Sequence, residues 1–441
     1  MVDVLIRHCD VLRTEGERAW VETDQDIAVE GARIQAMAAG GSLGAAAGEV
    51  IEARGMLAIP GLINTHAHVP MVLFRGLVED VSVESWFNDY VWPLESNLTA
   101  EDVYWGALLG MAEMIESGVT CVADHYFFMD EVARAAVESG MRAHLAWAVF
   151  EHQGEAQLER TAAFIREWQG AADGRIVTWM GPHSPYTCGP DFLRLCARRA
   201  AELGVGVHLH VSETQAQVDL CLRQYGLTPP ALLAETGILD GRALFAHCCY
   251  PTDADLELMA AHQVGVGRAP KTYMKLSSGT ADVRRLLAHG IPVGIATDGA
   301  TSSNSLDILE QMRLLTLLEK YMGGDSTAFP VGQALGLAFE GGARVLGQEQ
   351  DLGALQVGKL ADIVLVRQDA VHVWPRYDPA ANLVYSSRAS DVDTVLCNGK
   401  VLMRGRELRT IDKARVMREV AERLGRLNQR VPGSRIATYP V

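Results

Sequence analysis

The sequence of 441 residues lacks any long hydrophobic run, any run of basic residues and any Cys-x-x-Cys pair. Its apolar stretches are interrupted before the ~18 residues that a membrane-spanning helix requires, so no membrane partner is expected. Lys and Arg number 39 against 55 Asp and Glu, and this net charge of −16 disfavours nucleic acid as a partner. The cysteines are scattered, which is typical of reduced thiols in a cytoplasmic protein and argues against a disulfide framework or a zinc ribbon.

A glycine-rich phosphate-binding loop is also missing, and its absence bears on the fold class. An open doubly wound sheet is expected to carry Gly-x-Gly-x-x-Gly after its first strand, so that alternative is disfavoured. Eight strand-like segments alternating with helix-like segments over ~240 residues instead predict an α/β fold, a (β/α)8 TIM barrel. The predicted strands are Ala58–Thr65, Val119–His125, Arg142–Val149, Ile176–Gly181, Val205–Val211, Ala243–His247, Val264–Gly267 and Ile291–Thr297.

Both ends of the chain have the alternating pattern of β-structure, whereas the middle has the β/α rhythm. After the last barrel strand, two helical segments, Ser305–Tyr321 and Pro330–Leu346, precede a return to strand character at Gly353–Val366, Leu383–Val384 and Val392–Asn398. We therefore predict a small composite β-sandwich domain formed by residues 1–57 and 353–441, with a C-terminal helix at Lys413–Arg430. The metal-dependent catalytic barrel is predicted to occupy residues 58–352.

The stretch Leu57–Pro70, LAIPGLINTHAHVP, places two histidines two residues apart. Residues with this spacing share one face of a strand, so His66 and His68 point the same way and form half of a metal site. The alternative is a pair of core histidines bonded to backbone carbonyls. The choice between them depends on whether other strands supply the missing ligands.

Catalytic residues of such barrels lie at the C-terminal ends of the strands. Histidine or an acidic residue recurs at five of the predicted strand ends: His66 and His68, His183, His208 and His210 with Glu213, His247, and Asp298. A single strand-end histidine is usually structural, but this recurrence indicates one shared site.

Metal geometry then suggests a role for each residue. Three imidazoles and one carboxylate suit a divalent ion, so we predict His66, His68, His210 and Asp298 as ligands of one metal ion, with zinc expected and iron as the alternative. His208 lies one pleat deeper than His210 and is interpreted as barrel filling. Glu213 lies three residues past His210 and suits a general base.

Several motifs resemble those of the amidohydrolase superfamily, in the branch that deaminates heteroaromatic rings. They are PGLINTHAH (60–68), GPHSPYT (181–187), HVSE (210–213), AHC (246–248), GIATDG (294–299) and the tail segments GALQVGKLADIVL (353–365) and LVYSSRASDVDTVLCNGK (383–400). The resemblance covers nearly the whole chain and implies a homo-oligomer that acts on a small heteroaromatic substrate.

The resemblance also implies roles for individual residues. Glu213, His247 and Asp298 would be catalytic, with Glu213 as proton shuttle and His247 hydrogen-bonded near the attacking water. His183 would contact the substrate ring, and Trp86 and Glu95 would line the pocket, with Glu95 at a ribose. The segments around Trp86 and Glu95 are most similar to enzymes that deaminate adenosine derivatives such as 5-methylthioadenosine and S-adenosylhomocysteine.

The chain departs from the family where a His-Asn-Pro stretch is usual after the seventh strand. Here Arg268 replaces the histidine, and Tyr273 replaces an asparagine a few residues on. Arg268 is interpreted first as a buried ion pair with an acidic neighbour. The second interpretation makes Arg268 a substrate contact, which would favour a ring carrying an exocyclic oxygen or a carboxylate.

Three other functions are alternatives for such a chain. An aminohydrolase or chlorohydrolase for another ring (an s-triazine, guanine, 8-oxoguanine or a pterin) would use the same metal chemistry. An inactive barrel that serves as a binding protein would have a broken ligand set, and this chain has a complete one. A urease-like binuclear hydrolase would need a bridging lysine after the fourth strand, where this chain has His183.

Overall fold

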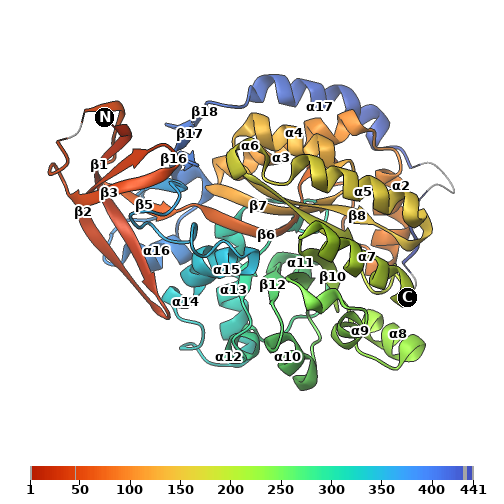
Figure 1. Cartoon of the computed structure of the whole chain (residues 1–441). Helices are drawn as coiled ribbons and strands as arrows, with labels where there is room; N and C mark the ends of the chain where they lie inside the picture. The colour runs from red at the N-terminus through yellow and green to blue at the C-terminus, as the bar shows by residue number, and fades with distance from the viewer. Residues whose placement is uncertain (1, 45, 431–434, 440–441) are drawn as a thin grey trace.

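The computed structural model describes residues 2–44, 46–430 and 435–439. Its centre is a parallel sheet curled into a barrel, with strand order β13-β12-β11-β10-β9-β8-β7-β6-β14 (Figure 1). The strands are β6 (Leu62–His68), β7 (Val119–Tyr126), β8 (Arg142–Val149), β9 (Ile176–Pro182), β10 (Val207–Val211), β11 (Ala243–His247), β12 (Val264–Arg268), β13 (Val293–Ile295) and β14 (Asp298–Gly299). Nearly every residue in them is buried, as expected where helices cover a parallel sheet.

The barrel closes through its last strand. Only Val293–Ile295 of the predicted strand Ile291–Thr297 forms a strand, β13, which pairs with β12. A second short strand, β14, follows it and pairs with β6, with Asp298 opposite Ala67. The Thr297 N–H donates to the His66 carbonyl at 3.2 Å across this seam. The (β/α)8 prediction is thereby confirmed, and closure brings Asp298 beside the His66–His68 strand.

Helices alternate with the barrel strands, as the sequence predicts. They include α3 (Ala100–Glu116), α4 (Met129–Ser139), α5 (Gly154–Trp168), α7 (Pro190–Leu203), α8 (Gln215–Tyr225), α10 (Asp253–Ala260), α12 (Val283–Ala288), α13 (Ile308–Gly323), α14 (Val331–Gly336) and α15 (Gly342–Leu346). Thr99 caps α3 in a capping box with Asp102, as its sequence suggests. A π-helical turn, η5 (Leu337–Gly341), joins α14 to α15 within the single helix predicted at Pro330–Leu346.

A second sheet is built from both ends of the chain and lies to one side of the barrel (Figure 1). Its path is β18-β17-β16-β15-β5-β1-β2-β3, and β4 pairs with β1 to form a branch. The strands are β1 (Val2–Glu15), β2 (Arg18–Glu30), β3 (Arg33–Ala39), β4 (Ala47–Glu52), β5 (Met56–Pro60), β15 (Ile363–Arg367), β16 (Val392–Cys397), β17 (Lys400–Arg404) and β18 (Glu407–Leu408). This sheet has a hydrophobic cluster of its own, so the prediction of a separate β unit built from both termini is confirmed. The bounds 1–57, 58–352 and 353–441 stay a prediction.

The predicted strand Ala58–Thr65 is divided in the structure. β5 ends at Pro60 and belongs to the composite sheet, whereas β6 begins at Leu62 and belongs to the barrel. Gly61 lies between them, where an added Cβ would come within 2.1 Å of Thr120 Oγ1. The continuous apolar pattern hides this change of sheet, because both halves are buried.

The strand predicted at Leu383–Val384 is wrong, because these residues lie in helix α16 (Pro379–Tyr385). Asp378 caps this helix by accepting a hydrogen bond from the Ala381 N–H at 3.0 Å, and Pro379 occupies the first turn. Both are ordinary start signals for a helix, and they outweigh the local apolar run.

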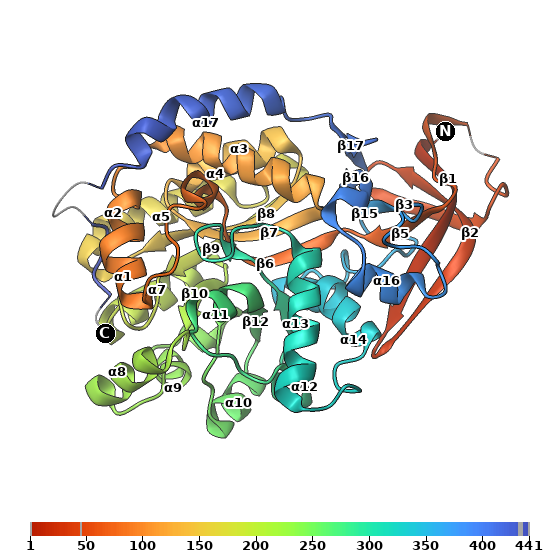
Figure 2. The same ribbon diagram turned by 180° about the vertical axis from the view of Figure 1, so that it is seen from behind.

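The C-terminal helix α17 (Lys413–Leu427) packs on α3 of the barrel and not on the composite sheet (Figure 2). Arg426 on α17 hydrogen-bonds the Asp102 carboxylate at 2.6 Å. No helix within the described residues is long and apolar enough to cross a membrane. All eight cysteines are buried and free of disulfides.

Candidate active site

The four predicted metal ligands converge at the C-terminal end of the barrel. His66 and His68 come from β6, His210 from β10 and Asp298 from β14. Asp298 Oδ1 lies 3.6 Å from His66 Nε2 and 3.2 Å from His68 Nε2. His210 Nε2 lies 3.2 Å from His68 Nε2. Parallel strands that end at one rim thus bring residues more than 200 positions apart within reach of one ion.

The other ring nitrogen of each histidine has a partner that orients it. His66 Nδ1 is hydrogen-bonded to His208 Nε2 at 2.9 Å, which gives His208 a role beyond filling the barrel. His68 Nδ1 donates to the His125 carbonyl at 2.6 Å, and His210 Nδ1 donates to the His183 carbonyl at 2.9 Å. This pattern is typical of metal-binding histidines, because it turns the lone pair of each Nε2 toward the shared centre.

His66 Nε2 supplies the test of whether a metal fits. It is fully buried and makes no hydrogen bond within the described structure, which is costly for a polar atom. His66 belongs to two groups of donor atoms that lie within 4.8 Å of one another, one with His68 and Asp298 and one with His210 and His247. Nitrogen and carboxylate donors together suit a divalent ion such as zinc. The residues present therefore fit a metal ion.

The pKa values of His66 and His68 are shifted in opposite directions. Burial lowers the pKa of His66 to about 4, so its imidazole is neutral at pH 7. Burial acts against the charged form of His68 too, but the neighbouring Asp298 raises the pKa of His68 to about 9. A metal ion held by His68 would have to displace that proton.

Glu213 lies beside the ligand set. Its carboxylate Oε1 is 3.9 Å from His247 Nε2, and its Oε2 accepts a hydrogen bond from Gln217 Nε2 at 3.3 Å. Burial, with a contribution from the charge of Asp298, raises the pKa of Glu213 to about 7. A carboxyl group with such a pKa can both accept and donate a proton near neutrality.

A narrow cavity of about 40 Å³ lies over these groups. Trp86, Glu95 and His183, the three predicted substrate contacts on the barrel rim, all line it, as do Glu213 and His247. Trp86 begins the π-helical turn η2 (Trp86–Val91), and Glu95 ends the short helix α2 (Trp92–Glu95). Burial raises the pKa of Glu95 to about 7.

Two further cavity residues were missed at the sequence level. His125 and Tyr126 end β7 and line the same cavity. His125 Nε2 lies 3.3 Å from the Gly181 carbonyl, and burial lowers its pKa well below the usual value. The signal was present, because His125 is another strand-end histidine of the kind that identified the rest.

The structure does not bring Arg268 to this cavity. Its guanidinium is fully buried and bonds the backbone carbonyls of Cys248 and Ala281, each at 3.2 Å, and the Thr280 hydroxyl at 2.6 Å. These acceptors are neutral, so the predicted ion pair is corrected as well as the predicted substrate contact. At the end of β12 the side chain points behind the turn at His247–Cys248 and not toward the candidate metal ligands.

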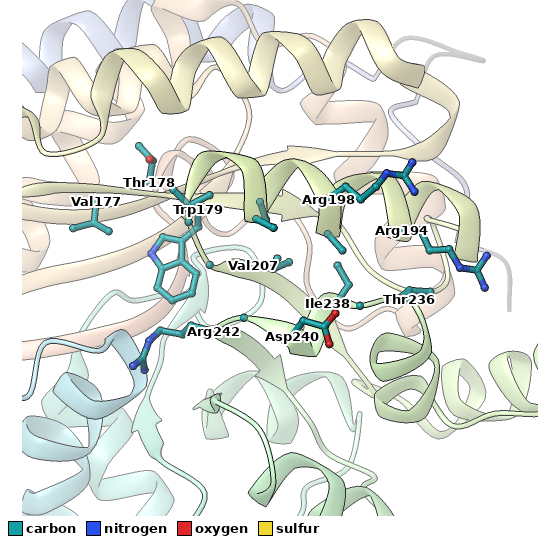
Figure 3. Close-up of a pocket in the computed structure, with 18 of the residues that line it drawn as sticks. Val177, Thr178, Trp179, Arg194, Arg198, Val207, Thr236, Ile238, Asp240 and Arg242 are labelled. Atoms are coloured by element: carbon teal, nitrogen blue, oxygen red, sulfur yellow. The ribbon is translucent and has the colours of Figure 1, made fainter.

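A larger cavity of about 760 Å³ lies elsewhere, between α7 and the N-terminal ends of β10 and β11. Figure 3 shows Arg194 and Arg198 directed outward from α7, away from Trp179 and Asp240. Arg194 pairs with Asp191 at 2.7 Å. Because its polar groups do not converge, this cavity offers no arrangement for catalysis.

The fold and the site together define a metal-dependent hydrolase barrel. A family model described as the amidohydrolase family matches residues 57–402, and the chain belongs to that family. Among curated relatives, the 5-methylthioadenosine/S-adenosylhomocysteine deaminase of Desulforudis audaxviator is 45% identical over 431 residues, which is 96% of this chain and 98% of that protein.

Solved structures of enzymes with this fold are also similar to the chain. An adenosine deaminase from Xanthomonas campestris with bound zinc superposes with a TM-score of 0.92 and 30% identity, covering 97% of this chain and 98% of that one. An atrazine chlorohydrolase from Arthrobacter aurescens complexed with zinc has a TM-score of 0.87 and 25% identity, covering 96% and 100% of the two chains. The chain is therefore a hydrolase of the amidohydrolase family.

Proposed function

We propose that the chain is a hydrolytic deaminase that releases ammonia from the adenine ring of an adenosine derivative, such as 5-methylthioadenosine or S-adenosylhomocysteine. The observation that carries the proposal is Glu213, a buried carboxyl group with a raised pKa, 3.9 Å from His247 and beside a complete ligand set. The substrate class is supported by the deaminase relatives at 41% to 45% identity.

We assign the metal site to His66, His68, His210 and Asp298, with zinc as the expected ion and iron as the alternative. When bound, the ion supplies Lewis acidity, which lowers the pKa of water from ~15.7 toward ~7. Neutral imidazoles at His66 and His210 leave their lone pairs free for it.

The chain's own residues perform the proton transfers. Glu213 accepts the proton of the attacking water and delivers it to the ring nitrogen next to the amino-bearing carbon. His247 donates a hydrogen bond to the attacking oxygen as charge develops there. Asp298 passes the second proton to the departing amine, so that ammonia leaves as a neutral molecule.

His183, Trp86 and Glu95 are proposed to bind the substrate. The His183 ring stacks on Phe150 with centroids 4.6 Å apart, which fixes a flat wall for the base. Burial lowers the pKa of His183 to about 3, so it faces the ring as a neutral imidazole. Glu95 Oε1 is buried without a hydrogen-bond partner in the described structure and is free to accept from a ribose hydroxyl.

The remaining parts of the proposal are a cytoplasmic location and a homo-oligomeric state. Eight buried, unpaired cysteines support a reducing compartment. The homo-oligomeric state is what the family resemblance implies. Light scattering coupled to gel filtration measures the mass directly.

A substrate panel tests the function. Zinc-loaded protein is assayed for ammonia release and ultraviolet change with adenosine derivatives, guanine, 8-oxoguanine, a pterin and aminated or chlorinated s-triazines. The highest kcat/KM is expected for 5-methylthioadenosine or S-adenosylhomocysteine. A higher value for a triazine or another base would move the assignment to that ring, and no turnover of any ring would reject a deaminase.

A further inference from the structure

Arg268 is the largest fully buried side chain among the described residues, yet its hydrogen-bond acceptors are all neutral. One terminal nitrogen donates to the His247 and Cys248 carbonyls, and the other donates to Thr280 Oγ1 and the Ala281 carbonyl. Taking an arginine out of water without a carboxylate partner is unfavourable. If this position only had to be filled, an apolar side chain could fill it without the free-energy cost of burying a charge.

The carbonyls that Arg268 contacts belong to an unusual turn. His247 has φ +74° and Cys248 has φ +49°, so two consecutive residues with side chains occupy the left-handed region. Such conformations cost free energy and persist only where the surroundings hold them. The Cys248 N–H donates to the Val211 carbonyl at 2.9 Å, and Arg268 holds the opposite, carbonyl side of the turn.

His247 also differs from the three histidines of the ligand set. Each of those rings is oriented by a hydrogen bond at Nδ1, whereas His247 Nδ1 is buried without a hydrogen-bond partner in the described structure. The orientation of its ring therefore depends on its backbone and on packing. The Tyr273 ring packs edge-on against it at 5.8 Å, and the Arg268 guanidinium lies over the face of that same tyrosine at 4.6 Å.

We propose that Arg268 is a positioning residue for the reaction, because it holds the left-handed turn at His247–Cys248 and, through Tyr273, the plane of the His247 ring. This inference rests on the proposed function for its kinetic consequence but not for its structural one. It gives a purpose to the arginine that stands where the family usually has a histidine.

The test replaces Arg268 with lysine. One ammonium group keeps the charge but lacks the planar guanidinium that lies over the Tyr273 ring while it bonds the His247 and Cys248 carbonyls. For Arg268→Lys we expect kcat to fall roughly 10- to 100-fold, with KM near the wild-type value and zinc still at one ion per chain. A merely structural role would instead lower the melting temperature and the folded fraction, and leave kcat per zinc-loaded site unchanged.

Thr280→Val is the matched control. It removes one acceptor of the guanidinium but leaves the two bonds to the His247 turn, so kcat should stay close to the wild-type value. If Arg268→Lys does not fold, Tyr273→Leu removes the ring that links Arg268 to His247 and should lower kcat with zinc retained.

A crystal structure of the zinc-loaded Arg268→Lys protein separates this inference from the proposed function. We expect a relaxed turn at residues 247–248 and a displaced His247 ring. Retention of both positive φ angles and of the His247–Glu213 distance would overturn the inference, whatever the substrate proves to be. An unchanged kcat at full zinc occupancy would overturn it equally.

Discussion

His66 is the residue that links the metal site to the barrel interior. Its Nδ1 is held by His208 from the layer beneath, while its buried Nε2 makes no hydrogen bond in the described structure. The hydrogen bond at Nδ1 fixes the orientation of the ring, and Nε2 is left to coordinate one metal ion, as proposed.

Replacing His66 with alanine should abolish tight metal binding. Three donors remain, but one imidazole and its orienting contact are lost, so zinc affinity should fall at least about 100-fold. Metal analysis after dialysis against a weak chelator measures the loss, and His289→Ala, at an exposed helix end, is the control that keeps its zinc. Full zinc content in His66→Ala would remove His66 from the ligand set.

Replacing Glu213 with glutamine should separate chemistry from metal binding. The amide cannot accept the proton of water, so kcat should fall roughly 10²- to 10⁴-fold while zinc stays bound. Rapid-mixing or steady-state ammonia release gives kcat, and Asp219→Asn on the exposed face of α8 serves as the neutral comparison. Wild-type turnover by Glu213→Gln would exclude Glu213 as the proton shuttle.

The pH profile should also report on Glu213. Burial raises its pKa from the ordinary 4.5 to about 7, and the charge of a bound zinc ion acts in the opposite direction. Because the base works only when deprotonated, kcat/KM should be full above this pKa and fall tenfold per pH unit below it. Assays at constant ionic strength should place the midpoint between 4.5 and about 7, and a flat profile down to pH 4.5 would contradict the assignment.

The candidate ligands could be identified from sequence because barrel topology brings strand ends together wherever they fall in the chain. The same reasoning also predicts His125, which the sequence analysis did not name. It does not predict the bond between His66 and His208, because that bond depends on how deep each side chain lies in the barrel. It does not predict the direction of the Arg268 side chain either, because that direction depends on the left-handed turn at the end of a different strand.

At the scale of whole elements, the join between β5 and β6 shows where periodicity fails. Residues 57–65 have one apolar pattern, yet they contribute to two sheets, and the change at Gly61 depends on contact with Thr120 on β7. The helix α16 shows the opposite case: the Asp378–Pro379 start signal was present in the sequence, but the prediction followed the apolar pair Leu383–Val384.

Gly61→Ala should therefore destabilise the fold. Its Cβ would lie 2.1 Å and 2.6 Å from the branched side chain of the buried Thr120, which has little room to move. We expect a loss of about 1–3 kcal/mol in the free energy of unfolding, seen as a lower melting temperature. Gly425→Ala in α17, where the added Cβ meets open space, should stabilise by about 0.5–1 kcal/mol, and equal effects of the two substitutions would contradict this account.

At the scale of the molecule, the composite sheet and the described tail support opposite ends of the barrel. The composite sheet is joined to the base of the barrel, where Arg142 at the start of β8 bonds Asp362 at 3.3 Å and Asn398 at 3.1 Å. The tail residues 435–439 lie at the other end, where the Tyr439 N–H and carbonyl bond the Asn88 side chain at 2.8 Å and 3.1 Å. The described tail thus lies against the wall of the candidate active site.

We expect that wall to move when substrate binds. The cavity of about 40 Å³ is much smaller than typical ligand pockets, which measure ~300–1,000 Å³. Phe87, on the turn η2, lines the cavity and stacks on Tyr439 with ring centroids 4.8 Å apart and planes 5° apart. The Tyr439 hydroxyl is hydrogen-bonded to Thr214 Oγ1 at 2.9 Å, next to Glu213.

Tyr439→Ala should weaken substrate binding, because the stack that holds Phe87 in the cavity wall is lost. Such aromatic pairs contribute about 0.5–1.5 kcal/mol, so KM should rise roughly 2- to 12-fold with little change in kcat. Tyr439→Phe keeps the stack and removes only the bond to Thr214, and Tyr377→Ala, at a side chain that is 94% exposed, controls for loss of a tyrosine elsewhere. Steady-state kinetics with the preferred adenosine derivative give KM for each variant. An unchanged KM in Tyr439→Ala, or an equal rise of KM in Tyr439→Phe, would show that the stack does not affect substrate binding.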